Sequence, residues 1–125
     1  MPGPSSLAEV RDYLRDFKRA ATEGRKKTEI WDRTKNRDAL PDLGLSERQR
    51  DDIILGLQPE HYCEGPMPDA DSERGGDVWV FGTEVHGTLV YVKLKLVGVE
   101  PLRRAMCLSF HRAEHPMEFP FRGKL

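Results

Sequence analysis

The sequence predicts an α+β protein in which two to three helices are followed by a small antiparallel sheet of three to four strands. Two observations lead to this prediction. Residues 6–57 contain runs with apolar residues at helical spacing, next to residues that commonly cap helices. Residues 77–112 contain three β-rich runs separated by turn signals. A chain of 125 residues is long enough for one hydrophobic core, so we expect residues 1–125 to form one domain.

The composition is typical of a globular protein of the cytoplasm, with 38% hydrophobic and 33% charged residues. No apolar run approaches the roughly 20 residues that span a bilayer. Arg11, Asp12 and Arg15 interrupt the region where a signal peptide would need an apolar core. Two cysteines, Cys63 and Cys107, are too few for a disulfide framework. We therefore expect a cytoplasmic protein that does not contact membranes.

The net charge of −1 hides an uneven distribution of charge along the chain. Residues 1–40 carry a net charge of +3, residues 41–77 of −7 and residues 78–125 of +3. Local positive charge at both ends permits RNA binding. The acidic residues 41–77 argue against a protein that binds nucleic acid along its whole length.

The first predicted helix begins at Ser6, which forms a capping box with Glu9, and ends at Gly24. Its apolar stripe is Leu7, Val10, Leu14, Phe17 and Ala21. The basic residues 25–33 are compatible with a short edge strand.

A second helix is predicted over Asn36–Leu43, ending at Gly44, and a third begins at Ser46, with Gln49 in the capping-box position. Residues 61–76 are rich in Gly, Pro and acidic residues, which is typical of a loop. Within them, Asp69, Asp71 and Glu73 alternate as the oxygen ligands of a calcium loop do. The remaining ligands of such a loop are absent, which favours a solvated surface loop.

The sheet prediction rests on a hairpin at His86-Gly87, where glycine supplies the positive φ of a tight turn. This turn pairs Val85 with Thr88, and a third strand follows over Arg104–His111. Alternation then predicts a core face that is formed by Trp79, Phe81, Val90, Val92, Leu94, Met106, Leu108 and Phe110. The opposite, open face carries Tyr91, Lys93, Lys95, Ser109 and His111. In the tail, Phe119 and Phe121 are expected to pack back onto the core.

One metal motif occurs, since His111, Glu114 and His115 match the H-x-x-E-H signature of inverted zinc proteases. That chemistry needs both histidines on one helix face and a third ligand further along the chain. Here the motif follows a predicted strand and Pro116 comes next, so we expect no metal site. The sequence has no phosphate-binding loop and no dinucleotide fingerprint, so we expect no cofactor.

Several blocks occur in a fixed order along residues 31–121: ALPDLGL, ILGLQPEHY, GDVWVFG, VYVKLKL and CLSFHRAEHP. In order and spacing, these blocks resemble bacterial toxins of the MqsR family, which are RelE-like mRNA interferases of type II toxin–antitoxin systems. The resemblance implies that the helices pack on one face of the antiparallel sheet. It also implies metal-independent cleavage of mRNA by attack of the ribose 2′-OH on the adjacent phosphate, and neutralisation by a cognate antitoxin protein.

The resemblance also assigns roles to individual residues. It implies that the catalytic residues are Tyr91, Lys93 and His111, where better-known members have lysine in place of the histidine. The expected substrate-binding residues are Lys95, Arg112 and Tyr62. Two positions depart from the family pattern, since Cys63 replaces a common lysine and Val80 replaces a polar residue.

These departures leave two hypotheses open. In the first, the protein is an endoribonuclease in which His111 exchanges protons, as histidine does near neutral pH, and Lys93 stabilises charge on the phosphate. In the second, it is a catalytically inactive RelE-like domain that binds RNA or an antitoxin-like partner protein.

Overall fold

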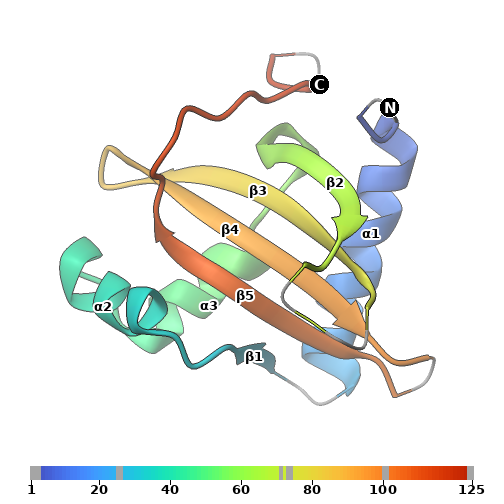
Figure 1. Cartoon of the computed structure of the whole chain (residues 1–125), viewed down its shortest axis with the longest axis horizontal. Helices are drawn as coiled ribbons and strands as arrows, with labels where there is room; N and C mark the ends of the chain where they lie inside the picture. Colours follow the sequence, from blue (N-terminus) through green and yellow to red (C-terminus); the bar gives the residue numbers. More distant parts are fainter. Residues whose placement is uncertain (1–3, 25–26, 71, 73–74, 100–101, 124–125) are drawn as a thin grey trace.

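The computed structural model describes residues 4–24, 27–70, 72, 75–99 and 102–123, which form a five-stranded mixed sheet with three α-helices (Figure 1). The helices are α1 (Leu7–Arg19), which continues into a π-helical turn η1 (Ala20–Gly24), α2 (Thr34–Leu43) and α3 (Glu47–Leu55). A 3₁₀ turn, η2 (Pro59–His61), follows α3. The strands are β1 (Thr28–Ile30), β2 (Tyr62–Pro68), β3 (Asp77–Val85), β4 (Thr88–Val97) and β5 (Arg104–Arg112).

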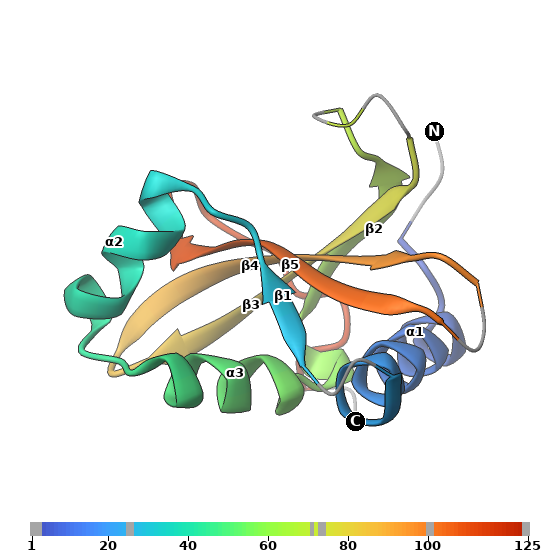
Figure 2. The same ribbon diagram turned by 90° about the horizontal axis from the view of Figure 1, so that it is seen from below.

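The strand order is β1-β5-β4-β3-β2, so β4 lies at the centre of the sheet. Helices α1 and α3 cover one face, which we call the core face, whereas α2 packs against β5 (Figure 2). We call the opposite face the open face. No helix in the described ranges is long and apolar enough to cross a membrane.

The α+β class is as predicted, but the strand number and the purely antiparallel sheet are not. The basic region after α1 forms the predicted short edge strand, β1, which runs parallel to β5, with Thr28 beside Ala105. The predicted loop over residues 61–76 contains a further strand, β2, which pairs antiparallel with β3. This strand was not predicted because it contains Pro66 and Pro68, and proline within a run argues against a strand. Proline is tolerated there because β2 is an edge strand, where one side of the backbone needs no partner.

The central hairpin has the predicted register. Val85 pairs with Thr88, and the turn residue His86 has a positive φ of 51°. The predicted core face of β3 and β4 is confirmed, since Trp79 pairs with Leu94 and the three β4 residues predicted for this face are buried: Val90, Val92 and Leu94. On this face the ring of Tyr13 from α1 stacks on Trp79, with 4.3 Å between ring centroids.

Strand β5 contains a β-bulge that the alternation pattern did not reveal. Lys93 pairs with Ser109 but the next residue, Leu94, pairs with Cys107, so Leu108 is the extra residue. The bulge reverses the faces of the first half of β5. Cys107 and Ala105 therefore belong to the core cluster, which corrects the prediction that Met106 lies on the core face; Leu108 is buried, as an unpaired bulge residue.

A buried asparagine fixes this bulge to α2. Asn36 donates from Nδ2 to the carbonyl oxygens of Leu108 (3.1 Å) and Trp31 (3.0 Å), and its Oδ1 accepts from the Phe110 amide (3.0 Å). The amide side chain thus continues the hydrogen bonding of β5 where β1 has ended.

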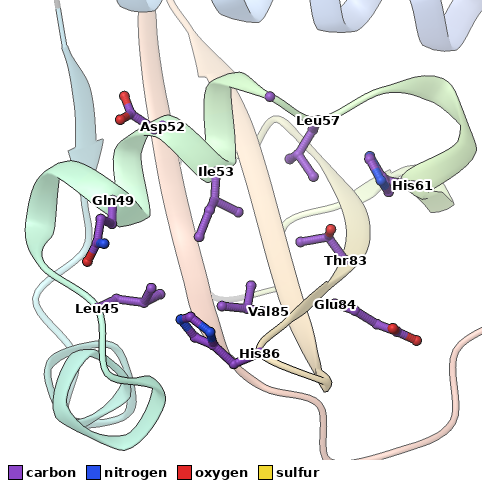
Figure 3. A pocket seen from close by; sticks show the side chains of 11 residues that line it. Leu45, Gln49, Asp52, Ile53, Leu57, His61, Thr83, Glu84, Val85 and His86 are labelled. Carbon is purple, nitrogen blue, oxygen red and sulfur yellow. The ribbon is translucent and has the colours of Figure 1, made fainter.

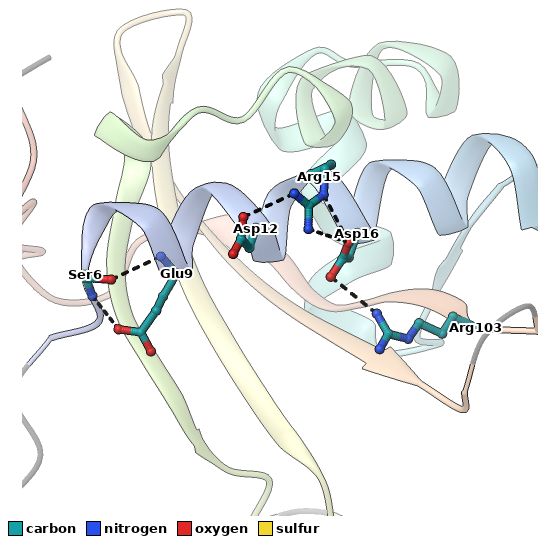
Figure 4. A network of polar contacts seen from close by, with 6 residues as sticks. All are labelled: Ser6, Glu9, Asp12, Arg15, Asp16 and Arg103. Carbon is teal, nitrogen blue, oxygen red and sulfur yellow. Dashed lines mark hydrogen bonds and ion pairs between the residues drawn. The ribbon is translucent and has the colours of Figure 1, made fainter.

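The helix ends follow the predicted capping signals. Ser6 Oγ accepts from the Glu9 amide (3.1 Å) and Glu9 Oε1 accepts from the Ser6 amide (2.9 Å), as Figure 4 shows. Ser46 and Gln49 form the same box at α3, and Gly44 ends α2 with a φ of 69°. Figure 4 also shows that Asp16 of α1 pairs with Arg103, just before β5, at 3.4 Å.

Replacement of Leu94 by alanine is expected to lower the free energy of unfolding by about 2–5 kcal/mol, because its side chain is fully buried at the centre of the sheet. Urea unfolding of the purified variant measures this. A loss of less than about 0.5 kcal/mol, which is typical of surface positions, would mean that the face assignment of β4 is wrong.

Candidate functional site

Residues from two parts of the chain cover the open face beside a hollow. The first are Asp69 and Gly75, which follow β2 and contact Lys95. Lys95 Nζ donates to Asp69 Oδ2 and to the Gly75 carbonyl oxygen, both at 2.8 Å. The side chains of Lys95 and Asp69 are only 10% and 1% exposed. Lys95, expected from the sequence to contact substrate, thus holds its ammonium group in an ion pair within the protein.

The second part is the C-terminal tail, which crosses the open face at Gly82. A side chain at Gly82 would collide with Met117 and Phe119, so the tail lies directly on the backbone of β3 there. Further along, the ring of Phe121 packs on Tyr62, with 5.8 Å between centroids. The predicted return of Phe121 to the core is confirmed.

The hollow on the open face, which we call the sheet pocket, has a volume of about 400 Å³. Its walls come from β2, β3, β4, β5 and the start of the tail. The lining residues are Cys63, Glu64, Val80, Tyr91, Lys93, Ser109, His111, Glu114, His115, Pro116 and Met117. All three predicted catalytic residues thus line one pocket, together with both positions that depart from the MqsR-like pattern.

Strand register explains this convergence. Tyr91 and Lys93 lie two residues apart on β4 and therefore project from the same face. Across the β4–β5 ladder, Tyr91 pairs with His111 and Lys93 pairs with Ser109. The rings of Tyr91 and His111 stack with 5.5 Å between centroids and 18° between planes. Because the β5 bulge lies before Ser109, the open-face positions Ser109 and His111 keep the predicted orientation.

The hydrogen bond of His111 fixes its tautomer. Nδ1 lies 2.9 Å from the carbonyl oxygen of Arg112, and a carbonyl oxygen can only accept. Nδ1 therefore carries the proton of the neutral ring. Nε2 is then the nitrogen that gains a proton, or that donates one from the imidazolium. This arrangement leaves one defined nitrogen for proton transfer in the pocket.

Two further groups of the pocket, the Tyr91 phenol and the Cys63 thiol, are held uncharged. Burial raises the pKa of the Tyr91 phenol, and the nearby Glu64 carboxylate raises it further. Burial likewise raises the pKa of the Cys63 thiol. Tyr91 can therefore donate a hydrogen bond, whereas Cys63 supplies neither the positive charge of the lysine that it replaces nor a ready thiolate.

Arg112 and Tyr62 lie outside the sheet pocket. Arg112 Nη2 pairs with Asp42 Oδ1 of α2 at 3.2 Å, because its side chain alternates with His111 and projects from the other side of β5. Tyr62 is fully buried, and its hydroxyl accepts from the Ser5 amide at 3.1 Å. Both were expected from the sequence to contact substrate, and the structure does not bring them together with the three catalytic candidates.

The sequence analysis did not assign four of the lining residues to this site: Glu64, Glu114, His115 and Met117. Glu64 lies on β2, which was not predicted as a strand. The other three belong to the irregular tail, where no periodicity indicates direction. Glu114 pairs with Lys35 Nζ at 2.6 Å, and this contact lowers the pKa of the carboxyl group.

A second cavity, of about 470 Å³, lies between α3 and the β3–β4 hairpin (Figure 3). Its apolar wall includes Ile53, Leu57 and Val85, and His86 stands at its rim. It contains none of the catalytic candidates. We place the candidate site in the sheet pocket because a cation, an imidazole and a phenol converge there, a combination that the cavity beside α3 lacks.

The zinc-protease motif lacks its helical setting. His111 ends β5, whereas Glu114 and His115 lie in the tail, so the two histidines do not share a helix face. Within the part of the chain that the structure describes, no three His, Cys, Asp or Glu side chains are grouped so as to hold a metal ion. Comparison of the chain with protein-family models, with curated proteins and with solved structures finds no match.

Proposed function

We propose that this protein is a metal-independent endoribonuclease of the cytoplasm, a RelE-like mRNA interferase that acts as the toxin of a type II toxin–antitoxin pair. The observation that carries the proposal is the convergence of Tyr91, Lys93 and His111 in one pocket. Tyr91 and Lys93 lie on the same face of β4, and the pairing of β4 with β5 brings His111 beside them. Their positions are those that the MqsR-like blocks assign to catalysis.

The three side chains supply the chemistry that RNA cleavage by an internal nucleophile needs. His111 Nε2 exchanges a proton with a ribose or leaving oxygen. Lys93 has no acidic partner among the described residues, so its charge is available to a phosphate in the pocket. The protonated Tyr91 phenol donates a hydrogen bond to the same phosphate, and its ring offers a surface on which a base stacks.

The second candidate function is a catalytically inactive RelE-like domain that binds RNA or an antitoxin-like protein. Two observations favour it. Cys63 and Val80 both line the pocket and contribute an uncharged thiol and an aliphatic floor where the related toxins carry polar or cationic groups. The acidic residues 41–77 would suit a basic protein partner better than RNA.

Expression of the chain alone is expected to slow bacterial growth, and co-expression of the protein encoded by the neighbouring gene is expected to restore it. The physical reason is that cleavage of mRNA limits protein synthesis until a bound antitoxin blocks the site. Growth curves with the His111→Gln chain as the control measure how much of the effect depends on this pocket. Unchanged growth at high expression would contradict the toxin assignment.

A further inference from the structure

Glu64 reaches the sheet pocket through a second β-bulge. Tyr62 pairs with Phe81 and Glu64 pairs with Val80, so Cys63 is an extra residue on β2. Bulges re-aim side chains and occur often beside active sites. Tyr62 remains in the core, whereas Cys63 and Glu64 both line the pocket. The bulge thus brings a carboxylate to the edge of the pocket that lies opposite His111.

The two carboxylates of the sheet pocket differ in their partners. No hydrogen bond or ion pair to the Glu64 carboxylate occurs among the described residues, whereas the other pocket carboxylate, Glu114, is held by Lys35 at 2.6 Å. The charge of Glu64 reaches the centre of the pocket, since it contributes to the raised pKa of Tyr91. An unpaired carboxylate is a poor phosphate contact but a good proton acceptor.

The strand order places the two proton-exchanging groups on opposite sides of the phosphate-stabilising pair. Glu64 lies on β2 and His111 on β5, with Tyr91 and Lys93 on β4 between them. Three strand spacings of about 4.8 Å separate the two backbones, which leaves room for a ribose and its phosphate between the side-chain ends.

We propose that Glu64 is the general base and His111 the general acid of RNA cleavage in the sheet pocket, an assignment that rests on the proposed function. Glu64 takes the proton of the ribose 2′-OH, and the 2′-oxygen forms a bond to phosphorus. The bond between phosphorus and the 5′-oxygen breaks, and that oxygen takes the proton from Nε2 of the His111 imidazolium. The products are a 2′,3′-cyclic phosphate and a 5′-hydroxyl, and proton exchange with water restores both side chains.

Two substrates separate the roles of base and acid. The first is an RNA oligonucleotide that the wild-type protein cleaves at a mapped position. The second has sulfur in place of the 5′-oxygen at that position, since a thiolate leaves without a proton and removes the need for a general acid. The variants are Glu64→Gln and His111→Gln, with Glu84→Gln as a matched control, because Glu84 is an exposed carboxylate on β3 outside the sheet pocket.

The expected result is a different pattern for each variant. Glu64→Gln lowers kcat by about 10²–10⁴-fold on both substrates, since the base is needed in each case. His111→Gln lowers kcat by a similar factor on the oxygen substrate and recovers most of the loss on the sulfur substrate. In pH–rate profiles, Glu64→Gln removes the rising limb and His111→Gln the falling limb. Glu84→Gln behaves as wild type.

Several results would overturn the assignment. These are full activity of Glu64→Gln, recovery of Glu64→Gln on the sulfur substrate, or an effect on KM alone with an unchanged pH profile. If Glu64→Gln does not fold, as judged by its thermal unfolding, Glu64→Asp replaces it and should keep the rising limb at a reduced rate. Absence of cleavage by the wild-type protein would instead mean that the proposed function itself fails.

Discussion

Replacement of His111 by glutamine is expected to lower the rate of RNA cleavage by about 10²–10⁴-fold, the usual contribution of a general acid or base. Glutamine keeps the approximate size and hydrogen-bonding capacity of the imidazole but cannot exchange a proton. The side chain lies near the end of β5, and among the described residues its one hydrogen bond is to the neighbouring Arg112 carbonyl, so the fold should hardly change. Single-turnover cleavage rates, measured together with the thermal unfolding of each protein, test this expectation.

A second histidine provides the control for this experiment. His86 lies in the β3–β4 turn, outside the sheet pocket, with a φ of 51°. Asparagine tolerates that left-handed backbone, so His86→Asn removes an imidazole without adding strain. It should cleave RNA at the wild-type rate. Full activity of His111→Gln with unchanged thermal stability would remove His111 from the mechanism.

Replacement of Lys95 by methionine is expected to lower the free energy of unfolding by about 3–5 kcal/mol, although Lys95 was first expected to bind RNA. Methionine fills a similar volume but leaves the buried Asp69 carboxylate without the ammonium group that lies 2.8 Å from it. The segment between β2 and β3 would then lose its attachment to the sheet. Urea unfolding at neutral pH measures the loss.

The double variant Lys95→Met/Asp69→Asn separates the buried charge from the packing. Replacement of the buried carboxylate by an amide should recover a measurable part of the stability that Lys95→Met loses. If Lys95→Met instead unfolds within about 0.5 kcal/mol of wild type, the ammonium group is a surface cation and its place as a substrate contact is restored.

Local signals in the sequence predicted the elements whose geometry depends on neighbouring residues in the chain. The capping boxes at Ser6 and Ser46 and the hairpin at His86-Gly87 each involve residues within a few positions of one another. The bulges of β2 and β5 depend instead on which residues the neighbouring strand presents. The segment CLSFH, with its buried Cys107 and Leu108 in succession, gives no unambiguous alternation.

The candidate site was predicted in part, for the same reason. Tyr91, Lys93 and His111 were found because β4 and the end of β5 alternate regularly. The ion pair of Lys95 was not predicted because its partner, Asp69, lies 26 positions away in a region that the sequence indicates as a loop. Glu64 was not predicted as a site residue because the prolines of β2 argued against a strand there. Cys107 lies in the core because of the β5 bulge, and burial there raises its pKa to about 12 and makes it unreactive.

The most direct test of the proposed ribonuclease is end-group analysis of the RNA fragments that the purified protein produces in excess EDTA. Attack by the ribose 2′-OH without a metal ion predicts that cleavage continues in the chelator. The upstream fragments should end in a 2′,3′-cyclic phosphate, or in the 3′-phosphate formed from it, and the downstream fragments should begin with a 5′-hydroxyl. A deoxyribose at the cleaved position should block the reaction. Fragments with 5′-phosphate ends, or cleavage that EDTA abolishes, would contradict the assignment.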